Sequence, residues 1–179
     1  MGARRALAAA LLPAALAAGA CSDAATGMPD CPSPRRLAIV AQAVPSAAYL
    51  PCIAERRQGW TVGALDVERD SARFSLRSDR ADGRRVDVEL RAACDDAGAV
   101  PTTPRADGVR TGLALDSISP RFAGTLVDAF AGGCVTYRFD FPRGPHIALM
   151  EDLQAIVGLV TRRELRLDLR RELGVDIGP

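Results

Sequence analysis

The sequence lacks several residue types that common active sites need. It has no lysine and no asparagine among its 179 residues, a single histidine, His146, and a single tryptophan, Trp60. Without a following lysine, Gly132-Gly133 does not fit a phosphate-binding loop, and a tight hairpin turn explains it. A nucleophilic triad would have to use His146, and a zinc site needs three or four ligands. We therefore assign no catalytic, cofactor-binding or metal-ligating residue, and expect no cofactor.

An excess of charge of one sign is also missing. The 23 basic and 22 acidic residues leave a formal net charge of +1. Without Arg4 and Arg5, which precede the first apolar run, 21 basic residues face 22 acidic ones. Nucleic-acid-binding domains carry a clear basic excess, so this balance argues against a nucleic-acid partner.

The only long apolar run lies at the N-terminus. Arg4 and Arg5 precede the uncharged run from Ala6 to Leu16, and the small residues Ala18-Gly19-Ala20 end at Cys21. This three-part layout is typical of a secretory signal. The run is short for a membrane span, which takes about 20 apolar residues. We expect residues 1–20 to be a signal peptide rather than a membrane-anchoring helix, so that the mature protein works outside the cytoplasm.

Two cleavage sites fit this segment. Ala18-Gly19-Ala20 satisfies the small-x-small rule of ordinary signal peptidase, whereas Leu16 to Cys21 resembles a bacterial lipobox with Ala18 in place of the usual leucine. Cysteine parity favours the lipobox, because an exported protein rarely keeps an odd exposed thiol. We expect Cys21 to carry lipid that anchors residues 21–30, a short tether, to the outer face of the cell membrane. Free secretion is the alternative.

The other four cysteines predict a disulfide-braced domain. Four cysteines allow three connectivities, which sequence alone does not distinguish. We predict the pairs Cys31–Cys52 and Cys94–Cys134. The first would hold an N-terminal helix to the segment after it, and the second would tie the third strand of a meander to a hairpin.

Residues 31–179 have the length of one domain, and their first half predicts a helix followed by strands. Pro34 after Ser33 favours a helix start, and apolar residues at helical spacing continue up to Pro45. Period-two alternation then predicts a meander with one buried and one wet face, with a turn at Asp82-Gly83. Its strands are expected at 62–67, 73–77 and 86–91.

The second half predicts a loop, more strands and two helices. Residues 95–107 are rich in proline, threonine and alanine, which indicates a mobile loop. A strand is expected near 113–118, and the hairpin around Gly132-Gly133 places Tyr137 on one face and Arg138 on the other. Helical spacing continues from Leu149 to Val160, and a capping box at Thr161 opens a second helix. The expected fold is α+β, an antiparallel sheet of a meander plus a hairpin covered by C-terminal helices.

Several short stretches resemble a family of uncharacterised exported proteins and lipoproteins from actinobacteria. They are Val44-Pro45-Ser46, Pro51-Cys52-Ile53, Gly59-Trp60, Ser78-Asp79-Arg80 and Gly132-Gly133-Cys134-Val135-Thr136-Tyr137-Arg138-Phe139. The similarity spans about Cys31 to Gly174. The family has no known activity, so the resemblance implies an envelope location and no mechanism.

Two classes of function stay open. One is a non-enzymatic envelope lipoprotein, a binding or structural module whose partner is an envelope protein, a lipid or a wall component. The other is an envelope hydrolase that uses a carboxylate pair. The candidate carboxylates are Asp66, Asp95, Asp96, Asp140 and Glu151, which also fit a solvated surface. We expect the binding or structural module.

Two further groups of residues have a functional and a structural interpretation. Arg163, Arg166 and Arg170 fall on one flank of the last helix, where they would contact anionic lipid head groups or simply face water. Trp60, Tyr137 and Phe139 would line a ligand groove or, as aromatic residues usually do, pack in the core.

Overall fold

The computed structural model describes residues 29–142 and 144–175. The expected signal peptide and Cys21 lie outside these residues. The helices are α1 (Pro34–Ala43), the short 3-10 helix η1 (Asp79–Ala81), α2 (His146–Ile156) and α3 (Arg162–Leu173). The strands are β1 (Tyr49–Ile53), β2 (Trp60–Val62), β3 (Asp66–Glu68), β4 (Ser71–Ser78), β5 (Arg85–Arg91), β6 (Val100–Pro101), β7 (Arg110–Ser117), β8 (Phe122–Phe130), β9 (Gly133–Phe141) and β10 (Val157–Thr161).

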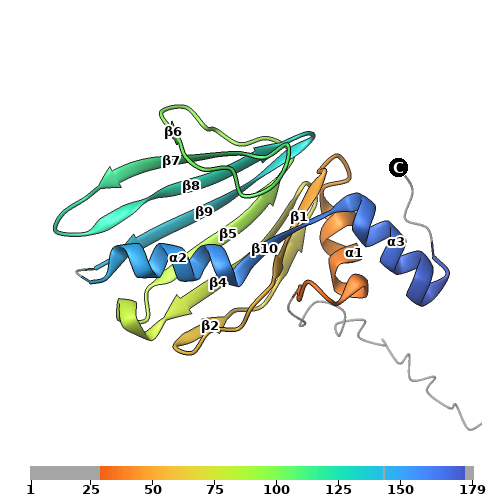
Figure 1. The fold of residues 1–179 in the computed structure, drawn as a ribbon, viewed down its shortest axis with the longest axis horizontal. Helices are drawn as coiled ribbons and strands as arrows, with labels where there is room; N and C mark the ends of the chain where they lie inside the picture. The colour runs from red at the N-terminus through yellow and green to blue at the C-terminus, as the bar shows by residue number, and fades with distance from the viewer. Residues whose placement is uncertain (1–28, 143, 176–179) are drawn as a thin grey trace, which may run out of the picture.

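The fold is α+β and antiparallel, as the sequence predicts. The large sheet has the strand order β2-β4-β5-β9-β8-β7-β6, and β3 also pairs with β4. A second, two-stranded sheet joins β1 to β10. Figure 1 shows α2 lying across one face of the large sheet and α1 and α3 side by side at one end of it.

Period-two alternation gives the large sheet its two faces. On the covered face, Val88 pairs with Phe74 on one side and with Tyr137 on the other, and all three are buried. They belong to one apolar cluster with residues of all three α-helices, including Leu37, Leu153 and Leu165. On the opposite, open face, the same strands carry exposed and half-buried polar side chains. The open face is therefore the surface that the fold leaves to solvent.

One arginine joins the start of α3 to the end of α1, in addition to the apolar contacts between the two helices. Arg162, the first residue of α3, donates hydrogen bonds to the carbonyls of Ala41 (3.0 Å), Val44 (2.7 Å) and Ala47 (2.8 Å). Carbonyls at the end of a helix lack partners within it, so Arg162 satisfies the end of α1. Burial, and then the nearby charge of Arg166, lower the pKa of Arg162.

Both disulfides join the predicted partners. Cys31–Cys52 ties the segment before α1 to β1, and Cys94–Cys134 ties the segment after β5 to β9. Gly158 of β10 faces the first bridge, since a Cβ there would lie 3.2 Å from the sulfur of Cys31 and 2.9 Å from Ala54. Structural disulfides of this kind indicate a protein that folds outside the reducing cytoplasm.

Two secondary-structure predictions are wrong. The helix expected to reach Val160 ends at Ile156, and residues 157–161 form β10, which pairs with the unpredicted strand β1. β-Branched valines favour a strand where a partner is at hand. The single strand expected at 62–67 is divided into β2 and β3. Gly63 still donates to the carbonyl of Ser75 on β4 (2.7 Å), and the pairing is then interrupted where Leu65 is buried.

The expected mobile loop after β5 is instead fastened to the sheet. Cys94 ties its start to β9, residues 100–101 pair with β7, and Arg105 enters the core. The hydroxyl of Tyr49 also donates to the carbonyl of Asp107 (2.5 Å). The segment therefore crosses the edge of the sheet and contacts both faces.

Within the described part of the chain, no helix is long and apolar enough to cross a membrane.

Candidate ligand-binding face

The open face of the sheet presents its polar side chains in rows that run across the strands. The cross-strand register aligns Ser75, Asp87, Arg138 and Thr125, on β4, β5, β9 and β8. The neighbouring row aligns Arg73 with Glu89 and Thr136. Neighbouring strands lie about 4.8 Å apart, so each row is a ladder of hydrogen-bonding groups at regular steps.

Two hollows adjoin on this face. The larger, of about 480 Å³, is lined by Ala64, Asp66, Arg73, Phe74, Ser75, Arg85, Asp87, Glu89 and Arg138. The smaller, of about 330 Å³, is lined by Glu89, Arg91, Ala93, Cys94, Asp95, Asp96, Ala97, Ala99, Ala114, Thr125, Val127, Thr136 and Arg138. Both lists contain Glu89 and Arg138, so these two side chains mark where the hollows meet.

The smaller hollow has a floor and a wall. Its floor is the small and β-branched side chains of Ala114, Thr125 and Val127, and its wall is residues 93–99. The disulfide from Cys94 to Cys134 fixes the start of this wall to β9. The hollow therefore depends on a covalent link as well as on the sheet.

Three of the four arginines around the hollows are paired with acids. Arg73 donates to Asp66 (2.8 Å), a hydrogen bond that raises the pKa of Arg73. Arg85 pairs with Asp87 (2.7 Å), and Arg91 pairs with Glu89 (3.0 Å).

Arg138 differs from these three arginines. It is exposed and makes no hydrogen bond or ion pair with any residue that the structure describes. An arginine presents a planar fork of donors that fits carboxylate and phosphate groups. The face thus offers one uncompensated cation at the junction of its two hollows. The sequence places Arg138 on the wet side of β9, but does not distinguish it from the other outward arginines.

His146 has a structural environment. Its ring stacks on Phe122, with the centroids 4.9 Å apart and the planes 15° apart. Its Nε2 is hydrogen-bonded to the carbonyl of Pro142 (2.9 Å). These contacts give the imidazole a packing role at the start of α2.

The candidate carboxylates do not gather in one place. Asp66 and Asp140 pair with Arg73 and Arg121, respectively. Asp95 and Asp96 lie in the wall of the smaller hollow, and Glu151 is exposed on α2, which covers the other face. Nothing in this arrangement pairs two of them across a cleft, as carboxylate hydrolases require.

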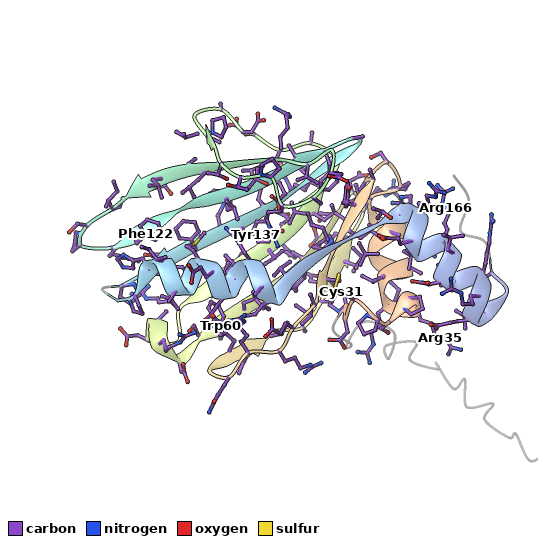
Figure 2. The ribbon with its side chains drawn as sticks, viewed as in Figure 1. Cys31, Arg35, Trp60, Phe122, Tyr137 and Arg166 are labelled. Atoms are coloured by element: carbon purple, nitrogen blue, oxygen red, sulfur yellow. A yellow bond between two sulfur atoms is a disulfide. The ribbon has the colours of Figure 1, made fainter. Side chains whose placement is uncertain are left out.

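The candidate aromatic residues pack in the core or along its margin. Tyr137 and Phe139 lie on the covered face of the sheet, where their exposed fractions are 0 % and 4 %. Trp60 is half-buried (Figure 2). The indole Nε1 of Trp60 donates to Asp152 (3.0 Å). Asp152 also accepts from Arg57 (2.9 Å) and Arg80.

The sequence did not single out Asp152 or a second buried carboxylate, Asp128. Asp128 is fully buried on β8, against Arg105, Thr111 and Tyr137. Asp128 lies in a strand and Asp152 in a helix, and no local sequence pattern marks either of them as a buried carboxylate. Their arginine partners come from distant segments of the chain. The donors around Asp128 are engaged with it inside the core, so this cluster joins elements. Asp152 joins α2 to Trp60, Arg57 and Arg80, and it lines an open hollow of about 620 Å³.

The arginines of α3 lie away from the open face. Arg163 and Arg170 are exposed, while Arg166 is half-buried and its Nε is buried without a hydrogen-bond partner among the described residues (Figure 2). Glu164, Asp168 and Glu172 lie on the same helix, and Asp168 pairs with Arg171 (3.2 Å). The helix therefore presents mixed charge.

No protein-family model, curated protein or solved structure matches this chain. Within the described residues, no group of three histidine, cysteine or acidic side chains is arranged to hold a metal ion. The site must therefore be interpreted from its own geometry.

Proposed function

We propose that the protein is an exported lipoprotein of the cell envelope, of the actinobacterial type that its motifs resemble, and that it is a non-enzymatic binding module. Its ligand site is the open face of the sheet. The observation that carries the proposal is the pair of adjoining hollows around Arg138, an exposed cation without a partner among the described residues. The two disulfides support an extracytoplasmic location.

The structural difference between the two faces of the large sheet also supports a binding role for the open face. The covered face completes its core with α2, and its buried groups Asp128, Thr111 and Tyr137 are hydrogen-bonded to one another or to Arg105. The open face keeps ordered polar groups in contact with water over four strands. A rigid, pre-formed surface of this kind binds a ligand without paying to order a loop.

The proposal is tested by filling the smaller hollow. Thr125→Trp places a large ring on the hollow's floor, while Ala123→Trp is its matched control on the same strand and face, outside both hollows. The purified wild-type protein is expected to capture a component from fractionated wall glycans, envelope lipids or envelope proteins. Thr125→Trp should lose this capture, and Ala123→Trp should keep it.

Two results would overturn the proposal. One is capture that is indifferent to Thr125→Trp. The other is turnover of a glycan, ester, peptide or phosphoester by the purified protein that disappears when one Asp or Glu is replaced by its amide, which would make the protein a hydrolase.

A further inference from the structure

We infer that the open face binds an acidic saccharide, with the carboxylate or phosphate of the sugar on Arg138 and its hydroxyl groups along the neighbouring rows. This inference rests on the proposed function, since it names the ligand class of the same site. It comes from the charges, the hydroxyl groups and the scarcity of aromatic rings around the two hollows.

The charges around the two hollows favour binding of an anionic group only at Arg138. Asp66, Asp87 and Glu89 each have an arginine partner at 3.0 Å or less. Arg138 remains uncompensated. At the far wall of the smaller hollow, Asp95 has no arginine partner among the described residues, and Asp96 has only the exposed Arg110 at 3.7 Å. A polyanion such as nucleic acid would meet these acids, but a ligand with a single oxyanion on Arg138 would not have to.

Free hydroxyl groups surround the cation. Ser75, Thr125 and Thr136 make no side-chain hydrogen bond to the residues that the structure describes, and all three line one of the two hollows. Each hydroxyl both donates and accepts. The carboxylates of Asp87 and Glu89 are paired with Arg85 and Arg91, but each carboxylate oxygen has a further lone pair that accepts. Donors and acceptors that alternate in this way match the hydroxyl groups of a sugar.

The two hollows that meet at Arg138 offer little to an apolar ligand. A third hollow on this face, lined by Ala99, Pro101, Pro104, Val127 and Ala129 among others, is more apolar, but Arg138 does not line it. Among the described residues, Phe74 is the only aromatic one that lines either of the two hollows at Arg138, and it is 4 % exposed because its ring points into the core. Peptides rich in aromatic or aliphatic anchors need pockets that bury those anchors. Aromatic side chains supply much of the contact energy of many interfaces, so in these two hollows charge and hydrogen bonds have to supply the affinity.

Arg77 is a matched control for Arg138. It lies on the same open face, on β4, and is likewise exposed without a hydrogen bond or ion pair to a described residue. It lines neither hollow. Arg77→Ala therefore removes the same charge from the same face without touching the site.

The experiment is calorimetric titration of the purified protein with three probes: an oligogalacturonate, a phosphorylated oligoglucose and a neutral oligoglucose. At least one acidic probe should bind about tenfold or more tighter than the neutral one. Arg138→Ala should weaken that binding by about tenfold, and Arg138→Lys by less, because an ammonium keeps the charge but not the fork. Arg77→Ala should leave it unchanged. Preference between the two acidic probes identifies carboxylate or phosphate as the recognised group.

The outcomes separate this inference from the proposed function. Equal binding of neutral and acidic probes, or acidic binding that survives Arg138→Ala, overturns the inference. Failure of all three probes, while an envelope protein or lipid is captured in a Thr125→Trp-sensitive way, also overturns it and leaves the binding module standing. If Thr125→Trp changes no binding of any kind, both fail.

Discussion

At the scale of single residues, one buried arginine links three parts of the molecule. Arg105 Nη1 donates to Asp128 (2.8 Å) and to the hydroxyl of Tyr137 (2.6 Å). Its Nη2 donates to the carbonyls of Gln154 (3.0 Å) and Val157, at the end of α2. Burial raises the pKa of Tyr137 well above its ordinary value. Burial also lowers the pKa of Arg105, but Tyr137 and Asp128 outweigh this and raise it, so the arginine stays charged.

We predict that Arg105→Ala lowers the free energy of unfolding by about 3–5 kcal/mol, the usual effect of leaving one charge of a buried pair alone. Asp128 is 0 % exposed and would keep only the hydroxyl donors of Thr111 and Tyr137. Urea denaturation of the two proteins measures the difference.

Two further variants make this prediction specific. Arg110→Ala removes an arginine that is 81 % exposed and should change stability by less than about 0.5 kcal/mol. Asp128→Leu combined with Arg105→Met replaces the pair with apolar groups and should recover a large part of the loss. A loss below about 1 kcal/mol for Arg105→Ala would show that Asp128 is not held as a buried charge.

At the scale of elements, α3 owes its start to a capping box. The hydroxyl of Thr161 accepts from the backbone N–H of Glu164 (3.0 Å), and the backbone N–H of Thr161 donates to the carboxylate of Glu164 (2.9 Å). We predict that Thr161→Ala lowers stability by about 1 kcal/mol. Denaturation followed by circular dichroism checks this, and an unchanged midpoint would mean that tertiary contacts alone hold the helix.

The same cap makes stability depend on pH. The backbone hydrogen bond from Thr161, and then that from its side chain, lower the pKa of Glu164 below 4.5. The stabilisation is therefore present above the unfolded pKa and is lost as the pH falls through the lower folded pKa. We predict that Glu164→Gln is less stable than the wild type at neutral pH, and that this difference shrinks in acid. Glu172→Gln, an exposed acid of the same helix, should show no such trend; a constant Glu164→Gln deficit at every pH would contradict the assignment.

The two disulfides allow a prediction that separates stability from binding. Each closed loop should contribute roughly 3 kcal/mol. Replacing Cys94 and Cys134 by serine should lower stability and also weaken ligand binding, because that bridge holds the wall of the smaller hollow. Replacing Cys31 and Cys52 by serine should lower stability by a similar amount with binding intact. Denaturation and ligand titration of both double variants test this. Equal ligand binding by the two variants would show that the wall of the smaller hollow does not contribute to the binding site.

The elements also show how far the sequence predicts this fold. β4, β5, β9 and α3 follow from local signals: alternation, the turn at Asp82-Gly83 and the capping box. β10 does not, because helical spacing continues through Val160 and its strand partner, β1, lies about a hundred residues earlier. The alternation of polar and apolar residues in β9 was enough to predict that Arg138 lies on the solvent-facing side of the sheet. The hollows were not, since they need the wall that a disulfide and a distant loop provide.

At the scale of the whole molecule, the described chain is fastened from its first residues. The amide of Ile53 donates to the carbonyl of Pro29 (2.8 Å), and Cys31 is bonded to Cys52. The seven residues from Ser22 to Met28 span at most about 25 Å when fully extended. A lipid on Cys21 would therefore keep the domain close to the membrane and leave the binding face to meet ligands there.

We predict that Cys21 carries this lipid and is the mature N-terminus. Cys21→Ser should move the protein from the membrane fraction to the soluble fraction. Both disulfides and the melting temperature should stay unchanged, because the four other cysteines pair within the domain. Immunoblotting of the fractions and mass spectrometry of the N-terminal peptide measure the two effects, and Ser22→Ala is the matched control that should remain membrane-bound. A wild-type protein found in the medium with an unmodified Cys21 would show instead that ordinary signal peptidase releases the chain, and the binding face would then act on ligands away from the cell surface.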